Sequence, residues 1–406
     1  MEQRTRGIYI IISSVLAFAF NLSFTAAAVY RIQIAQLAPY QLILVGTALE
    51  IGVLVFETPT GVLADLKSRK LSVLIGLAVI GIGFAIEASF TAFLMIAFAQ
   101  IVWGMGYTFI SGALHAWVSD ELMNQGIEEL LLSGAQYGRF FSILGIGVAM
   151  GLGAISIRLA MYTAAGVLIV SSIVLSGIMP ENHFSPTVQK GKVWSQYWNQ
   201  MTSGIQHIRK HRILSVLLIV FLLYGLYSEG IDRLYELYIL EHLNLDNLLN
   251  IPAVWVIGGL NAIISIAGIL MLGLVKKNLS AGIKTVILVM QLTMMMVVGI
   301  LLFAYSPSVF FAMAGFLVFR MTREGTYPLL EAIQLRNTPS EIKATVLSTF
   351  SQTDAIGQLV SGPLMVAVAA MFGIQPTFAF SAVLLGAVIV MLMSLIRRMR
   401  VHKEEK

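Results

Sequence analysis

GVLADLKSRK, residues 61–70, places one acidic and three basic residues where two long apolar segments of the chain meet. The apolar segments run over 38–64 and 71–90. A hydrocarbon core about 30 Å thick is crossed by about 20 helical residues, and only a helix satisfies its own backbone groups there. Each segment has that length, so the stretch predicts a short polar loop that joins two transmembrane helices.

The rest of the chain repeats this pattern. Of its 406 residues, 58% are hydrophobic and only 12% are charged, and the mean hydropathy is +0.85. Soluble domains carry about 25% charged residues. We therefore predict an all-α membrane protein with twelve transmembrane helices, at 7–30, 38–64, 71–90, 92–118, 137–157, 159–179, 213–239, 251–275, 281–304, 307–333, 343–370 and 375–396.

The longest polar break, at 181–212, divides the predicted spans into an N-terminal half, 1–180, and a C-terminal half, 213–406. Within the break, apolar and aromatic residues recur at helical spacing beside basic ones. This pattern predicts an amphipathic helix on the membrane surface. Its apolar residues are Trp194, Tyr197, Trp198, Met201, Ile205 and Ile208, and its basic residues are Lys190, Lys192, Arg209, Lys210 and Arg212.

The basic residues predict the orientation in the membrane. Of the 26 lysines and arginines, 21 fall on the side of both termini, two fall on the other side (Arg31 and Arg158) and three lie inside spans. The positive-inside rule then makes both termini cytoplasmic, and we expect a multi-pass protein of the cell membrane. Basic residues that face anionic lipid account for the net charge of +5, so no nucleic-acid partner is expected.

The two halves carry traces of an internal repeat. Gly61-Val62-Leu63 recurs 207 residues later as Gly268-Ile269-Leu270, although Leu272 stands where the first half has Asp65. The segment ALHA at 113–116 matches LLEA at 329–332 after a shift of 216. Two such repeats suit a transporter that alternates access to a site near the middle of the membrane.

The opening stretch closely resembles the loop between spans two and three of the major facilitator superfamily, G-x-L-a-D-r-x-g-R-[KR]. The resemblance implies a secondary transporter that works by alternating access. It also implies that a gating cluster of Gly61, Asp65, Arg69 and Lys70 stabilises the outward-facing state, with the glycine permitting close helix approach. A simpler interpretation remains open, in which these charges only fix the topology.

Two departures from drug exporters of this superfamily bear on the direction of transport. The arginine that such exporters often carry in span four is absent from QIVWG, residues 100–104. In span five the glycines of GVAMG, residues 147–151, permit close packing but are followed by leucine rather than proline. The stretches 56–61 and 111–117 nevertheless resemble bacterial tetracycline and multidrug efflux members.

Charged residues inside the spans are the candidate functional groups, because each costs roughly 2.5–3.5 kcal/mol facing lipid at mid-depth. Glu50 and Asp354 lie near the midplane without a basic residue within one helical turn in the sequence, so we expect one of them to carry the coupling proton. Arg320 with Glu324, and Glu229 with Arg233, stand four residues apart. Structural ion pairs and ligand contacts are both open for them.

Depth along the predicted spans separates the remaining candidates. A substrate cavity is predicted from Asn21, Gln100, Trp103, Tyr107, Tyr224, Asn261, Arg320, Arg323, Glu324, Tyr327 and Gln358. Gates are predicted from Glu57, His115, Glu331, Glu229 and Arg233.

The function we expect is proton-motive-force-driven export of small amphipathic compounds or drugs, with a solute importer of the same fold as the alternative. The chain has no cysteine and no nucleotide-binding, metalloprotease or hydrolase motif, so we expect neither an enzyme nor a cofactor or metal. A channel would need a repeated selectivity loop, which the sequence does not show. The expected partners are a small-molecule substrate, protons and the lipid bilayer, and the expected state is a monomer.

Overall fold

A computed structural model describes residues 2–123, 125–184, 211–277, 282–338 and 343–404, together with 202, 205, 206 and 208. These residues form helices joined by short turns, without a strand. The helices are α1 (Glu2–Val29), η1 (Tyr30–Ile34), α2 (Pro39–Leu66), α3 (Arg69–Ser89), α4 (Phe93–Ser111), α5 (Ala113–Glu121), α6 (Ile127–Ile155), α7 (Ile157–Ile178), α9 (Arg212–Leu237), η2 (Tyr238–His242), α10 (Leu245–Leu249), α11 (Ala253–Lys277), α12 (Ile283–Tyr305), α13 (Val309–Arg336), α14 (Lys343–Phe372) and α15 (Ile374–Glu404).

The predicted spans are confirmed as helices. Within the described residues, eleven helical segments are long and apolar enough to cross a membrane. The twelfth is α13, which is 28 residues long but carries Arg320, Arg323, Glu324 and Glu331. Its charges lower its hydropathy without breaking the helix.

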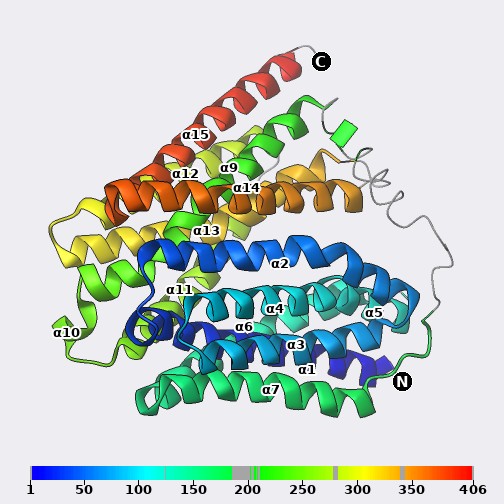
Figure 1. Cartoon of the computed structure of the whole chain (residues 1–406). Helices are drawn as coiled ribbons and strands as arrows, with labels where there is room; N and C mark the ends of the chain where they lie inside the picture. Colours follow the sequence, from blue (N-terminus) through cyan, green and yellow to red (C-terminus); the bar gives the residue numbers. More distant parts are fainter. Residues whose placement is uncertain are drawn as a thin grey trace. The chain divides into compact units, whose positions relative to one another are not determined.

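The chain folds into two compact units. The first comprises Met1–Lys190 with Glu236–Ala262, and the second comprises Gly191–Tyr235 with Ile263–Lys406. In the first unit α2 packs on α4, α4 on α3, α3 on α7, and α1 on both α6 and α7 (Figure 1). The predicted boundaries of the halves at 180 and 213 stay a prediction, and most of the predicted amphipathic helix lies outside the described residues.

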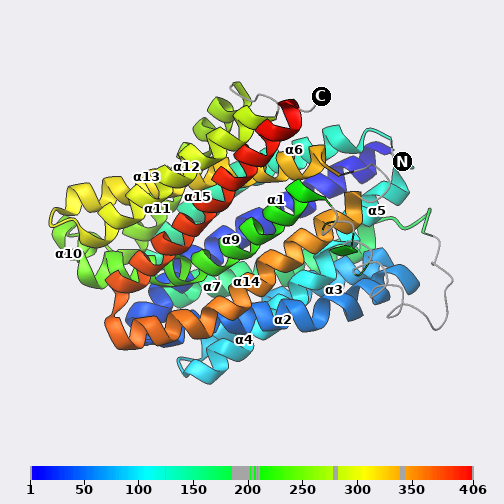
Figure 2. The same cartoon turned by 90° about the horizontal axis from the view of Figure 1, so that it is seen from above.

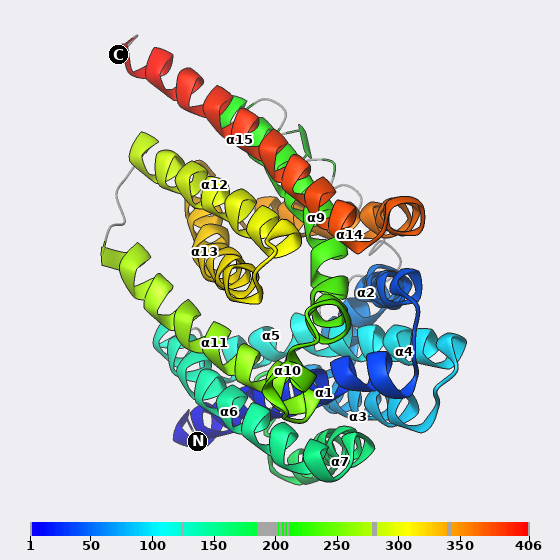
Figure 3. The same cartoon turned by 90° about the vertical axis from the view of Figure 1, so that its left-hand side faces the viewer.

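Corresponding helices pack alike in the two units. In the first, α3 packs on α4 and α7, and in the second, α12 lies between α13 and α15 (Figure 3). Glycine pairs allow close approaches at these contacts. A Cβ on Gly106 would lie 3.1 Å from the carbonyl oxygen of Gly76, and a Cβ on Gly299 would lie 2.7 Å from that of Gly315. Each backbone therefore occupies the space that a side chain would need.

The ends of α1 and α9 share a feature that the sequence did not reveal. Each helix widens into a π-helical segment that begins at a tyrosine, η1 at Tyr30 and η2 at Tyr238. The sixth residue after each tyrosine has a positive φ, 51° at Gln36 and 50° at Asn244. The shift between the segments is 208 residues (238 − 30), close to the 207 of the glycine match. This agreement supports the internal repeat.

Several boundaries differ from prediction for local reasons. The fifth span begins at Ile127 rather than 137, because α6 extends through a polar first turn. The fourth is broken at Gly112 into α4 and α5. The seventh continues through η2 to His242 instead of ending at 239. That last extension changes the depth of the charges near its end.

Candidate functional site

The loop motif of residues 61–70 forms a network at the predicted cytoplasmic end of the first unit. Arg69 begins α3, and its guanidinium donates to the carboxylate of Asp120 and to the carbonyl oxygen of Ala116, the latter at 2.7 Å. Asp65, one turn before it, lies 3.9 Å from the same guanidinium. The predicted gating residues Asp65 and Arg69 are therefore brought together, with Asp120 of α5 as a partner that sequence reasoning missed.

A second missed carboxylate, Glu181, fixes the start of α3. It accepts a hydrogen bond from the backbone N–H of Lys70 at 2.9 Å and one from the hydroxyl of Ser68 at 2.6 Å. Ser68 in turn caps α3 by accepting from the N–H of Leu71 at 2.8 Å. A carboxylate at a helix N-terminus is favourable because the first N–H groups and the helix dipole face it. The network ties the motif to the end of the sixth span.

The predicted close helix approach at Gly61 is not present. Among the described residues no atom lies within 4 Å of a Cβ built there, and the same holds for Gly147 and Gly151 in α6. A close contact of α6 is made instead at Gly145, where a Cβ would overlap the carbonyl oxygen of Phe18 in α1. Glycine spacing in the sequence thus indicated the helix but not the contacting residue.

An aromatic cluster in the first unit holds two predicted cavity residues. Trp103 of α4 stacks on Tyr107 with ring centroids 6.2 Å apart, and it meets Phe20 and Phe24 of α1 edge-on at 5.9 and 5.6 Å. Tyr107 is 43% exposed. Because the indole Nε1 of Trp103 is buried without a partner among the described residues, the cluster combines a flat apolar surface with one unused donor.

Gln100, also predicted to line the cavity, is buried and occupied elsewhere. Its amide donates to Glu87 of α3 at 2.7 Å, and Glu87 also accepts from Arg31 of η1 at 2.6 Å. This network neutralises a buried carboxylate and joins the predicted outer ends of three helices. Gln100 therefore has a structural partner in the described part of the chain.

The second unit concentrates its charges around Asp232. One oxygen of this carboxylate accepts from Arg320 at 3.4 Å and from Arg323 at 2.5 Å. Arg320 therefore pairs with α9 rather than with Glu324 of its own helix. Glu324 instead packs on α11, 3.3 Å from the position of a Cβ on Gly268.

The predicted seventh span ends at 239, which would leave Asp232 only seven residues from its end (239 − 232). With the helix continuing to His242, Asp232 lies ten residues from the end (242 − 232), or about 15 Å at 1.5 Å per residue. Arg320 lies eleven residues after Val309 (320 − 309), or about 16 Å from the start of α13. Asp232 and Arg320 thus share one depth, and Arg323 lies three residues further along α13, about 21 Å from its start (323 − 309 = 14 residues).

Tyrosines surround the charged cluster. Arg320 lies over the ring of Tyr235 at 5.7 Å and Arg323 over that of Tyr227 at 5.6 Å. Tyr224, a predicted cavity residue, contacts the hydroxyl of Thr293 at 3.1 Å and is buried. Tyr327, another, packs edge-on against Phe221 at 5.7 Å.

The two predicted coupling carboxylates lie on different units. Asp354 of α14 accepts from Gln358 of its own helix at 2.8 Å and is half-buried. A Cβ on Gly225 of α9 would overlap the carbonyl oxygen of Asp354, so α9 and α14 run side by side there (Figure 2). Glu50 of α2 is also half-buried.

The remaining predicted cavity and gate residues lie outside the aromatic cluster and the charged cluster. Asn21 joins α1 to α6 through Ser142 at 3.0 Å, and Asn261 of α11 donates to Thr25 at 3.4 Å. The predicted pair of Glu229 and Arg233 is present at 3.1 Å. Three predicted gate residues have exposed side chains: Glu57, His115 and Glu331.

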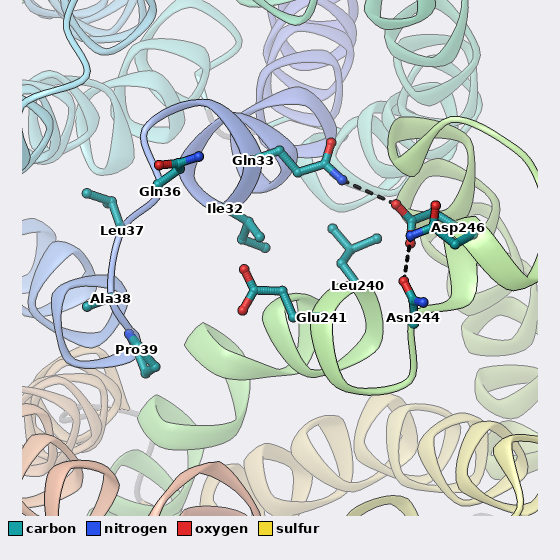
Figure 4. Close-up of a pocket in the computed structure, with 11 residues that line it drawn as sticks. Ile32, Gln33, Gln36, Leu37, Ala38, Pro39, Leu240, Glu241, Asn244 and Asp246 are labelled. Carbon is teal, nitrogen blue, oxygen red and sulfur yellow. Dashed lines mark hydrogen bonds between the residues drawn. The ribbon is translucent and has the colours of Figure 1, made fainter.

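A polar pocket of about 610 Å³ lies in the first unit between the ends of η1 and η2 (Figure 4). Because it lies at the predicted outer ends of the helices, we call it the outer-end pocket. Gln33 reaches across it and donates to Asp246 at 3.2 Å. Its other lining residues come largely from matching positions of the repeat: Ile32, Gln36, Leu37, Ala38 and Pro39 from one segment, and Leu240, Glu241, Asn244 and Asn247 from the other.

Solved structures share the fold. The nucleoside transporter NupG superimposes with a TM-score of 0.78 at 14% identity, covering 96% of this chain and 98% of that one. The human organic anion transporter MFSD10 (TETRAN) gives 0.64 at 16%, covering 96% and 99%. A bacterial homologue of the human lysosomal transporter Spinster, inward-facing and unoccupied, gives 0.72 at 10%, covering 97% and 98%.

No curated protein matches the sequence. The Major Facilitator Superfamily, however, matches residues 8–289, more than half of the chain. This match agrees with the loop motif of residues 61–70, the twelve helical spans and the repeated packing of α3 and α12. The chain belongs to the Major Facilitator Superfamily.

Proposed function

We propose that this secondary transporter exports small amphipathic compounds in exchange for protons. The observation that carries the proposal is Asp354, a half-buried carboxyl inside α14 whose hydrogen-bond partner is Gln358. Among the described residues no basic side chain lies within 4 Å of it. A charged carboxylate inside the hydrocarbon layer is costly, and taking up a proton removes that cost. Asp354 is therefore suited to carry a proton between the two sides.

The amphipathic substrate is supported by the surfaces of the two units, each taken by itself. The first unit offers the aromatic cluster of Trp103, Tyr107 and the phenylalanines of α1. The second offers polar and aromatic groups together, because Arg320 lies over the ring of Tyr235 and Arg323 over that of Tyr227. Binding sites for small molecules combine apolar and aromatic walls with a few polar groups. Export is supported by the resemblance of stretches 56–61 and 111–117 to efflux members.

Expression in a host that lacks its own efflux pumps tests the proposal. Cells that carry the wild-type chain should accumulate less of an exported compound than cells with the empty vector, and an uncoupler should abolish the difference. Asp354→Asn should behave as the empty vector, while Asp354→Glu should keep part of the activity because it keeps the carboxyl. Higher accumulation of a nutrient in the wild-type cells would contradict export and establish an importer.

A further inference from the structure

The charged cluster of the second unit is not balanced. Arg320 and Arg323 bring two positive charges to one carboxylate, that of Asp232. The other nearby carboxylates make no ion pair with either arginine: Glu229 pairs with Arg233 at 3.1 Å, Asp354 accepts from Gln358 at 2.8 Å, and Glu324 packs against Gly268 of α11. Within the described residues no second carboxylate lies within 4 Å of either Arg320 or Arg323, so two guanidinium groups share one carboxylate as their ion-pair partner.

The cluster lies about 15–21 Å from the ends of its helices, where a cation without an ion-pair partner of its own is costly. The side chains are partly exposed: that of Arg320 is 20% exposed, that of Arg323 28% and that of Asp232 26%. Exposure of these groups to lipid would cost several kcal/mol, so we expect the open part to face a water-filled path. A charged group from solution can then reach them.

The donors left over define what that group is. A guanidinium presents five N–H donors in a planar fork that matches the two oxygens of a carboxylate. The Nε of Arg320 is buried and has no hydrogen-bond partner among the described residues. The hydroxyl of Tyr227, whose ring lies beneath Arg323, is likewise buried and has no partner among them. Tyr235 and Tyr227 hold the guanidinium groups in place by cation–π contact. The positive charge of the two partly exposed guanidinium groups points to an acceptor with negative charge.

We infer that the transported compound carries a carboxylate that binds Arg320 and Arg323. This inference rests on the proposed function, because it names the class of substrate for the same transporter. Asp232 acts as a positioning residue that holds the two arginines while the site is empty and competes with the substrate for them. The expected substrate is thus an amphipathic organic anion, with its apolar part separate from its charge.

The test uses matched ligand triplets and the purified transporter reconstituted in liposomes. Within each triplet the apolar group stays the same and the polar end is a carboxylate, an amide or an amine. The first triplet is 4-phenylbutyrate, its amide and 4-phenylbutylamine, and the other two carry a naphthyl or an octyl group in place of the phenyl group. Binding is measured by thermal stabilisation and transport by counterflow. We expect the carboxylates to bind and exchange best. Arg323→Gln should weaken carboxylate binding about tenfold, as loss of a charge-assisted hydrogen bond predicts, and should leave amide binding unchanged.

Two further variants separate recognition from folding. Arg158→Gln is the matched control, because Arg158 also lies over a tyrosine ring, that of Tyr30 at 5.8 Å, yet stands outside the cluster. It should leave carboxylate binding unchanged. Asp232→Asn removes the competing carboxylate and should lower the concentration of carboxylate needed for half-saturation. If the ion cluster only held the fold together, Asp232→Asn would not raise the apparent affinity for the carboxylate. This variant therefore still tests carboxylate recognition if Arg323→Gln fails to insert in the membrane.

The outcomes separate the inference from the proposed function. Preference for amines or amides, failure of every carboxylate to bind, or unchanged carboxylate binding in Arg323→Gln would overturn the inference while leaving proton coupling intact. A carboxylate preference that persists in counterflow without any response to a pH gradient would overturn the coupling and support the inference.

Discussion

Tyr30 and Tyr238 occupy matching places in the two repeats. The carbonyl oxygen of each accepts the N–H of the residue five positions on, at 2.8 Å from Ala35 and 2.9 Å from Leu243. Each therefore begins a π-helical widening at the end of the first helix of its half. Such widenings are rare in proteins, and many of those that are known lie at functional sites. Here the pair borders the outer-end pocket.

This relationship predicts that the two π-helical ends separate during transport. The chain has no cysteine, so the double variant Gln33→Cys, Asp246→Cys would contain only the two introduced thiols. In the native chain the side chains of Gln33 and Asp246 are hydrogen-bonded at 3.2 Å. Linking them with a short bifunctional reagent should inhibit transport by at least about tenfold, since alternating access requires the outer side to open. Reduction of a cleavable linker should restore it.

The control for this experiment is a second cysteine pair, at Asn244 and Asn247. These side chains contact each other at 2.6 Å within one short turn, so their link constrains neither π-helical end against the other. Transport by this pair should survive the reagent. If the variant cross-linked through Gln33→Cys and Asp246→Cys still transports at the full rate, the pocket does not open during transport.

The loop motif leads to a prediction about coupling between residues. Arg69→Ala and Asp120→Asn should each lower the transport rate about tenfold, and the double variant should cost no more than either single one, because the two groups act as one pair. Lys67→Ala, an exposed position in the same loop, is the control and should transport normally. Additive losses in the double variant, measured as initial rates at equal expression, would argue against a shared role.

The glycine contact between α12 and α13 predicts a loss of stability. A Cβ on Gly299 would lie 2.7 Å from the carbonyl oxygen of Gly315 and 2.8 Å from the N–H nitrogen of Phe319, and backbone atoms cannot rotate away. Gly299→Ala should therefore destabilise the protein by about 1–3 kcal/mol and lower its Tm in detergent. Gly386→Ala in α15 meets no described atom within 4 Å and should leave the Tm unchanged. Equal Tm values for the two variants would contradict the packing.

The sequence predicted the spans well because hydropathy and helix length are local properties. It could not predict the π-helical ends, since YRIQI and YILEH share only their first residue. Nor could it predict that Arg320 pairs with Asp232, because these residues lie 88 positions apart and local pairing with Glu324 was equally consistent with the spacing. The loop motif drew attention to Asp65 and Arg69, which lie 3.9 Å apart, but the carboxylates that bind the motif, Asp120 and Glu181, belong to other segments whose approach only the fold reveals.

The central claim is that Asp354 carries the coupling proton, and reconstituted transport tests it most directly. Wild type and Asp354→Asn are compared in liposomes with an imposed pH gradient and, separately, in counterflow without one, with Glu50→Gln as the parallel variant for the other predicted carboxyl. We expect Asp354→Asn to lose the response to the pH gradient and to keep counterflow, because a neutral amide can bind substrate but cannot release a proton. A full response of Asp354→Asn to the pH gradient would contradict the claim.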